Sequence, residues 1–250
     1  MSQVEQALDE ERIWVVYQPI VELSTGKVFG HEALARSSVP EWYDPPTILA
    51  AAIQERMCGR LGRALRAMAS KHAPNQTLFI NIHPNEFDEG WLVQADDAIF
   101  SHQEPVYVEI TESVPLSHFR FCQTLMREIR VKGIFLAVDD LGSGYSNLKY
   151  IAELEPDVVK LDIGLIAGLP TSTRQRTLVT SIVRLCEELG ARTVAEGIET
   201  PEELAAVIDT GATYGQGFHI ARPASPPPPV NWKAVLSGGT GPVFWRPGLK

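Results

Sequence analysis

Short apolar runs alternate along the chain with stretches whose apolar residues recur every three to four positions. The runs are rich in β-branched residues and end in polar turns, so each predicts a buried strand. The eight predicted strands are 13–20, 28–35, 78–83, 106–112, 134–140, 157–162, 192–197 and 214–220. Helical spacing is found at Leu178, Ile182, Leu185 and Leu189 and again at Phe119, Cys122, Met126 and Ile129. Strands that alternate with helices predict parallel pairing.

The first two predicted strands are joined differently from the others. Only residues 22–27 separate them, and Ser24-Thr25-Gly26 predicts a tight turn of the kind that closes a hairpin. The length of 250 residues suits a barrel of alternating strands and helices. We therefore expect an α/β fold, a TIM-like (β/α)₈ barrel with the first strand antiparallel, over residues 13–223. A polar segment at 1–12 precedes it, and a Pro/Gly-rich tail at 224–250 follows it.

Composition and charge narrow the class of protein. Hydrophobic residues make up 44% and charged residues 21% of the chain, which are ordinary globular values. The formal net charge of −9 argues against general nucleic-acid binding, since such proteins cluster Lys and Arg. The three widely spaced cysteines fit neither a disulfide framework nor a zinc site. There is no export signal and no apolar run long enough to span a bilayer, so we expect a cytoplasmic protein without membrane contact.

Carboxylates follow several of the predicted strands. They are Glu32, Glu109, Asp139, Asp140 and Glu196. Strands packed side by side would bring these acids to one rim, where each unpaired couple about 4 Å apart costs roughly 4 kcal/mol at an effective dielectric constant near 20. The pattern therefore predicts divalent cations. Side-chain alternation points Asp139 inward and Asp140 outward, so we expect the chain to leave the strand at residues 141–144, which would let both aspartates reach one pocket.

Each of these residues also has a simpler interpretation. A single acid after a strand is commonly a solvated strand end or a helix cap. Gly142-Ser143-Gly144 has the composition of a phosphate cradle, but a plain turn is the favoured interpretation. Asn81 either caps the next turn or offers a neutral oxygen to a hard cation. We interpret His31 and His83 as packing residues, because alternation points His31 to the opposite strand face from Glu32 and His83 lies past Asn81.

Lys160 is the basic residue inside an apolar strand, and a buried lysine is rare unless it is paired. It predicts an ion pair with Asp162 or another acid of the pocket. It equally suits a cation that holds the attacking water or a phosphate oxygen. These two interpretations are compatible.

The residues discussed so far belong to a series of motifs that resembles a known family. From about residue 13 to 223 the chain is similar to the EAL domain, a cyclic-di-GMP-specific phosphodiesterase. The motifs, in the family's order, are Tyr17-Gln18-Pro19-Ile20, Glu32-Ala33-Leu34-Ala35-Arg36, Asn81, Glu109-Ile110-Thr111-Glu112-Ser113, Asp139-Asp140-Leu141-Gly142-Ser143-Gly144-Tyr145-Ser146, Val159-Lys160-Leu161-Asp162, Val194-Ala195-Glu196-Gly197-Ile198-Glu199-Thr200 and Gln216-Gly217-Phe218. Departures from the family pattern include Ala35 and Leu141, which are not ligand positions, and residues 218–221, which the resemblance places at the substrate rim.

The resemblance implies a role for each matching position. One metal would be bound by Glu32, Asn81, Glu109 and Asp139, and the second by Asp139 and Asp140. Among the catalytic residues, Lys160 would contact the attacking water, and Glu196 would act as general base or as a metal ligand through water. Gln216 would orient Glu196, and Glu199 would support Glu196. Substrate contacts are implied for Gln18, Leu34, Arg36 and Asp162. Loop and dimer coupling is implied for Glu112, Gly142, Ser143 and Gly144.

The resemblance implies hydrolysis of cyclic di-GMP to linear 5′-pGpG with two divalent cations, Mg²⁺ or Mn²⁺, and Ca²⁺ is expected to inhibit. It also implies a homodimer and leaves room for a sensor or regulatory partner. Two alternatives stay open. One is a cyclic-di-GMP-binding effector that has weak or no activity. The other is a barrel enzyme that removes a proton next to a carboxylate with Mg²⁺ and a lysine, although the adjacent aspartates favour two cations over one.

Overall fold

The computed structural model describes residues 2–42, 44–88, 94–111, 124, 126–143 and 148–238. Its eight strands form a closed barrel in chain order. Strand β1 runs antiparallel to β8, whereas the pairs β3–β4, β5–β6, β6–β7 and β7–β8 are parallel. The predicted fold class is therefore confirmed. The strands are β1 (Ile13–Glu22), β2 (Val28–Ser37), β3 (Leu78–Asn81), β4 (Val106–Thr111), β5 (Phe135–Leu141), β6 (Val158–Leu161), β7 (Arg192–Ala195) and β8 (Tyr214–Gly215).

The last strand is much shorter than the sequence predicts. The apolar run 214–220 indicates a seven-residue strand, but β8 contains only Tyr214 and Gly215. The backbone N–H groups of Ile220 and Ala221 both donate to the carbonyl of Gly217, so the second half of the run is a turn. A Cβ atom at Gly217 would lie 2.1 Å from the carbonyl oxygen of Ile198, so this turn packs directly on a neighbouring backbone.

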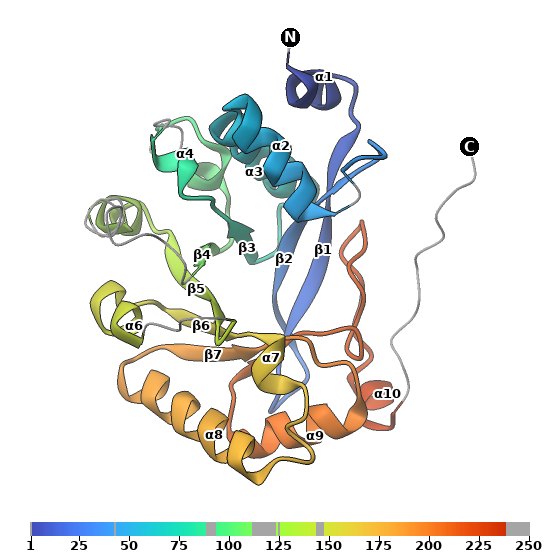
Figure 1. Ribbon diagram of the computed structural model, residues 1–250, viewed down its shortest axis with the longest axis vertical. Coiled ribbons are helices and arrows are strands. Elements are labelled where there is room, and N and C mark those ends of the chain that lie inside the picture. The colour runs from blue at the N-terminus through green and yellow to red at the C-terminus, as the bar shows by residue number, and fades with distance from the viewer. Residues whose placement is uncertain are drawn as a thin grey trace. The chain divides into compact units, whose positions relative to one another are not determined.

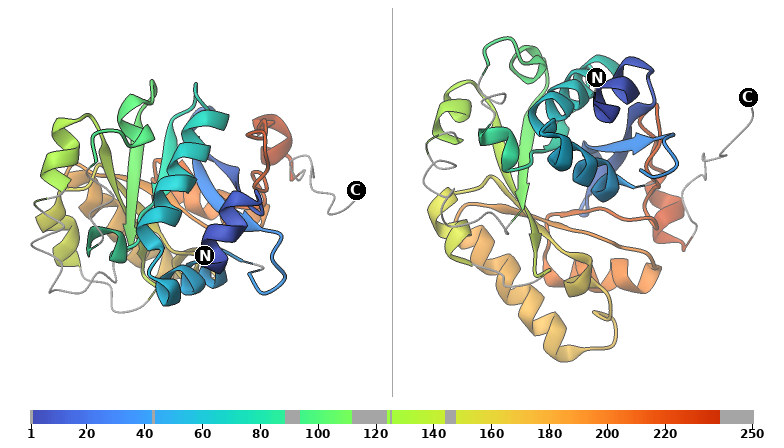
Figure 2. Two further views of the ribbon diagram at one scale, coloured as in Figure 1. Left: turned by 90° about the horizontal axis from the view of Figure 1, so that it is seen from above. Right: turned by 45° about the horizontal axis from the view of Figure 1, so that its top comes forward.

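The chain divides into two compact units, and β1 and β2 contribute to both. The first unit contains residues 1–17, 32–110 and 114–136. Its helices are α1 (Gln3–Asp9), α2 (Pro45–Glu55), α3 (Cys58–His72), α4 (Asn85–Asp88) and the 3₁₀ helix η1 (Ala98–Ser101). Helices α1, α2 and α3 pack together near the N-terminus, where Val4, Trp42 and Ile48 belong to one apolar cluster (Figure 2). The segment 1–12, which its polar composition left without a predicted structure, thus contributes a helix to this unit.

A buried ion cluster lies between α3 and the segment that follows β3. Arg66 is fully buried, and its Nη1 and Nε atoms lie 2.6 and 2.8 Å from carboxylate oxygens of Glu86 and Asp97. Gly62, one turn earlier, allows this approach because a Cβ atom there would lie 2.1 Å from Oε2 of Glu86. Burial raises the pKa of Glu86, and the charge of Arg66 opposes that rise. Sequence patterns gave no sign of this cluster.

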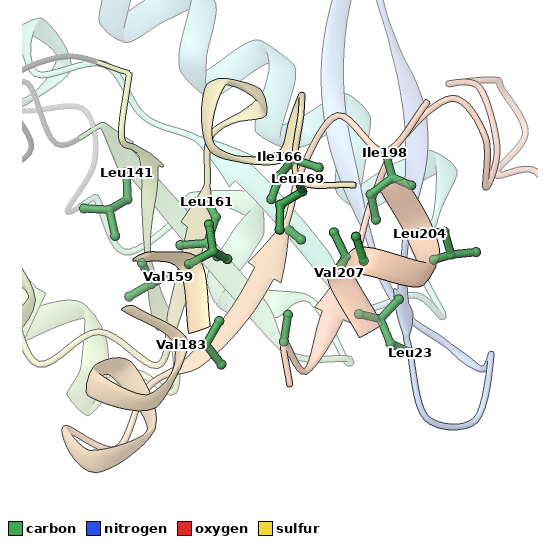
Figure 3. Close-up of a cluster of buried hydrophobic side chains, with 14 of the residues drawn as sticks. Leu23, Leu141, Val159, Leu161, Ile166, Leu169, Val183, Ile198, Leu204 and Val207 are labelled. Atoms are coloured by element: carbon green, nitrogen blue, oxygen red, sulfur yellow. The ribbon is translucent and has the colours of Figure 1, made fainter. Parts of the chain in front are cut away.

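The second unit contains residues 18–31, 111–113 and 137–250. Its helices are α6 (Leu148–Leu154), α7 (Ile163–Ile166), α8 (Thr173–Glu188), α9 (Pro201–Thr210) and α10 (Trp232–Leu236). Helix α8 packs against both β7 and α9 (Figure 1). Side chains from β5, β6, α8 and α9, among them Leu141, Leu161, Val183 and Leu204, form its apolar core (Figure 3).

Two local predictions in this unit are confirmed. The turn between β1 and β2 is closed by bonds from the N–H of Gly26 to the carbonyl of Glu22 and from the N–H of Glu22 to the carbonyl of Lys27. Helix α9 begins with the predicted capping box, in which Thr200 and Glu203 each bind the other's backbone N–H.

No helix among the described residues is long and apolar enough to cross a bilayer.

The Pro-rich tail contains a short helix that its composition did not predict. Val235 of α10 is fully buried and belongs to the core of the second unit, and its carbonyl oxygen lies 3.0 Å from Nε2 of buried His219. Trp232 packs on the hairpin turn, since a Cβ atom at Gly26 would lie 2.0 Å from its ring. Residues 224–238 are thus partly integrated into the fold.

Candidate metal centre

In the first unit, predicted ligands lie on β2, β3 and β4, with Glu32 in the middle of β2, Asn81 at the end of β3 and Glu109 in the second half of β4. Glu32 is buried in β2, and its Oε1 accepts a hydrogen bond of 3.0 Å from Nδ2 of Asn81. Asn81 ends β3 and is the register partner of Glu109 in β4. Glu109 is only 1% exposed. Since an ionised carboxylate is costly to bury, two buried acids beside an amide suit a cation-binding edge.

The second half of β2 carries residues implied in substrate binding. Leu34 and Arg36 are half-buried, and Nη1 of Arg36 donates to the carbonyl of Ala35. Burial lowers the pKa of Arg36 while the charge of Glu32 opposes that change, and the guanidinium stays protonated. His31 is buried, and burial lowers its pKa to about 4, so it is neutral at pH 7.

In the second unit, Asp139 and Asp140 are brought together by an irregularity in β5. The pairing with β6 shifts between Val138 and Leu141, and Asp140 has a left-handed φ of 62°. The strand ends at Leu141 and a turn begins at Gly142, so the chain leaves the strand within residues 141–144, as predicted. The irregularity at Asp140 adds a change of direction that the sequence did not predict, since an extra residue in a strand re-aims the side chains around it.

Lys160 lies between acids from two neighbouring strands. Its Nζ atom is 3.2 Å from Oδ1 of Asp139 and 2.8 Å from Oε1 of Glu196, and the side chain is 1% exposed. The predicted ion pair with a pocket acid is therefore confirmed, with these two partners. Asp162 has a different role, because its Oδ1 accepts from the N–H of Gly164 and caps α7.

The second unit contains a group of oxygens that could hold a metal ion. One carboxylate oxygen from each of Asp139, Asp140 and Glu196 lies within 4.8 Å of the others. Three carboxylates and the ammonium group of Lys160 leave a formal charge of −2. Carboxylate oxygens are the ligands that Mg²⁺ and Mn²⁺ prefer, so the donor set fits a hard divalent cation.

Gln216 and Gln18 form a hydrogen-bonded pair beside the end of β8. Nε2 of Gln216 donates to Oε1 of Gln18 over 3.2 Å, and Nε2 of Gln18 donates to the carbonyl of Ala221 over 3.2 Å. Both side chains are buried. Ala221 enters this network through its backbone, so no side-chain motif could have predicted it.

The remaining predicted residues occupy less specific positions. Glu199 is exposed, and its backbone N–H donates to Glu203 in the cap of α9, so its support of Glu196 stays a prediction. Gly142 has a φ of 107°, and the N–H of Ser143 donates to the carbonyl of Asp140, which is the geometry of a turn. Glu112 and Gly144 lie outside the described residues.

Comparison with known proteins identifies the family of this chain. The family model described as "EAL domain" matches residues 1–223. The chain belongs to the EAL domain family. Among curated EAL relatives from Pseudomonas aeruginosa, the cyclic di-GMP phosphodiesterase RocR is 30% identical over 89% of this chain and 60% of its own length. The cyclic di-GMP phosphodiesterase NbdA is 28% identical over 89% of this chain and 30% of its own length.

Solved structures agree with the family assignment. Klebsiella pneumoniae BlrP1, solved in complexes with cyclic di-GMP and either calcium or manganese, has a TM-score of 0.75 and 32% identity to this EAL domain. The alignment covers 85% of this chain and 56% of BlrP1. The chain thus spans less than two thirds of the length of each of these three relatives.

Proposed function

We propose that this EAL domain hydrolyses cyclic di-GMP to linear 5′-pGpG with the help of two divalent cations, Mg²⁺ or Mn²⁺. The cluster of Asp139, Asp140 and Glu196 around Lys160 is the observation that carries the proposal. Relatives with this domain are named cyclic di-GMP phosphodiesterases, and BlrP1 was solved with the dinucleotide and metal.

The proposed ligands come from strands that follow one another in the barrel. Glu32, Asn81 and Glu109 would join Asp139 at one cation, and Asp139 and Asp140 would hold the other. When bound, paired divalent cations lower the pKa of water and stabilise the attacking and leaving oxygens of an in-line displacement. Asp139 would be shared by the two cations, since a carboxylate offers two oxygen ligands.

The other side chains would move protons and hold the substrate. Lys160 would orient the attacking water and add positive charge near phosphorus, while Glu196 would accept the water's proton. Arg36, a planar donor of several N–H groups, would bind a substrate phosphate. The amide of Gln18 offers hydrogen bonds that suit the edge of a guanine, and Gln216 would orient Glu196.

The decisive experiment compares Asp139→Asn with the wild-type domain and with Asp209→Asn, a matched control at an exposed position of α9. Each protein is incubated with cyclic di-GMP and Mn²⁺ or Mg²⁺, and the products are separated by chromatography. We expect pGpG from the wild type and the control, and none from Asp139→Asn. Full turnover by Asp139→Asn would refute the ligand assignment, and wild-type binding without product would favour the effector alternative.

Further parts of the proposal concern the whole protein. We propose a cytoplasmic homodimer, inhibition by Ca²⁺ and a sensor or regulatory partner. Light scattering at several concentrations tests the dimer, and adding Ca²⁺ to the Mn²⁺ assay tests the inhibition. Incorporation of deuterium from solvent into a carboxylate substrate would instead support the proton-abstraction alternative.

A further inference from the structure

Helix α7 lies between two loops that carry acids of the proposed metal centre. One loop follows Asp139 and Asp140 and contains Gly142, and the other follows Glu196 and contains Gly197. Both glycines have left-handed φ values, 107° and 66°, which few other residues adopt. A glycine directly after a strand-end acid was visible in the sequence, but its packing partner was not.

Two side chains of α7 pack directly on these glycines, one on each. A Cβ atom at Gly142 would lie 2.6 Å from Cγ and Cδ1 of Leu165, and one at Gly197 would lie 2.4 Å from Cγ1 of Ile163. Leu165 and Ile163 therefore rest on the backbones of the two acid-bearing loops. Any other residue at either glycine would push α7 away from that loop.

The position of α7 is fixed from two further directions. At its start, the N–H of Asp162 donates to the carbonyl of Leu141, and the N–H of Glu196 donates to the carbonyl of Leu161. Behind it, Nε2 of Gln175 in α8 shares its two hydrogens among three carbonyls, those of Gly164, Leu165 and Ala167, over 3.2, 2.8 and 2.8 Å. Helix α7 is thus held by both neighbouring strands and by α8.

We infer that α7 is a spacer that sets the separation between the Asp139–Asp140 pair and Glu196, with Leu165, Ile163 and Gln175 as positioning residues. The inference rests on the proposed function, because it concerns the same cation site. Lys160 offsets only one of the three carboxylate charges, so a net repulsion acts on the cluster when no cation is bound, and a rigid element between the two loops would resist it. Outer residues that orient ligands typically change metal affinity about 10- to 100-fold when they are removed.

The test measures Mn²⁺ binding by isothermal titration calorimetry without substrate. We expect Leu165→Ala to weaken one of the two binding steps about ten-fold, the lower end of the range for outer-shell residues, and to leave the other step unchanged. Leu165→Met, which fills the same space, should retain wild-type affinity. The control is Leu178→Ala, at an exposed position of α8, and should also bind like the wild type.

Gln175→Ala provides a second test that leaves the apolar contacts intact and removes the three bonds behind α7. It should weaken the same binding step. If Leu165→Ala and Gln175→Ala both fold and bind Mn²⁺ as tightly as the wild type, the spacer role of α7 is refuted and the proposed function still stands. A wild-type domain that binds no Mn²⁺ would overturn both, so the two failures are distinguishable.

Discussion

Replacement of Arg66 by methionine is expected to destabilise the first unit strongly, because it leaves Glu86 and Asp97 buried without their cation. Removing one partner of a buried ion pair typically costs about 3–5 kcal/mol. For a domain of this size, that corresponds to a fall of roughly 6–20 °C in the midpoint of thermal unfolding. Arg63→Met is the matched control on the same helix, since Arg63 pairs with the exposed Asp96 and should cost less than about 1 kcal/mol.

The pH dependence separates lost charge from lost packing. Burial raises the pKa of Glu86, and Arg66→Met removes the charge that opposes the rise. When the pKa of an acid is higher in the folded state, the folded protein binds more protons than the unfolded one, so stability falls as pH rises above the unfolded pKa of about 4.3. The penalty of Arg66→Met should therefore be larger at pH 7 than at pH 5.

Thermal unfolding by circular dichroism at pH 5 and pH 7 measures both effects. Glu86→Gln, added to Arg66→Met, removes one of the two buried carboxylates that have lost their cation and should restore part of the stability at pH 7. The reasoning fails if Arg66→Met costs no more than Arg63→Met. It also fails if the penalty is the same at both pH values, since a cavity alone would behave in that way.

Two more predictions test contacts of the second unit. Lys160→Met should lower turnover at least about 100-fold in the cyclic di-GMP assay without weakening Mn²⁺ binding, because it removes a positive charge that aids catalysis but repels the cation. Lost Mn²⁺ binding would contradict this assignment. His219→Phe removes the side-chain donor from the carbonyl of Val235, which still accepts from the N–H of Gly238, and should lower the free energy of unfolding in urea by about 0.5–1.5 kcal/mol, whereas His72→Phe, at an exposed helix end, should not.

The strand order was predictable because hydrophobic periodicity is a local property of the chain. Each apolar run identified a strand, and the short linker containing Gly26 identified the antiparallel hairpin. Strand ends were less predictable, since the apolar run at 214–220 is equally compatible with a strand and with the buried turn that the structure contains. Apolar character reports burial, and it does not by itself distinguish these two backbones.

The ligands of the candidate site were predictable because acids after buried strands are chemically conspicuous, and the contacts that hold them were not. Arg66 and its partners are separated by 20 and 31 residues, so the cluster has no local pattern. The role of Gln175 depends on three backbone carbonyls, which every sequence contains. Long-range and backbone contacts therefore required coordinates.

The bulge at Asp140 explains why adjacent aspartates serve one site. In a regular strand, neighbouring side chains point to opposite faces, so a second acid at this position would face the helices. The left-handed conformation at Asp140 breaks that alternation, and aspartate adopts it more readily than most residues. Oδ1 of Asp139 accepts the N–H of Asp140 over 2.9 Å and so supports the bent backbone. Asp140 is therefore both the residue that distorts the strand and a proposed metal ligand. The free-energy cost of its left-handed backbone falls at the position where binding of the proposed cations can offset it.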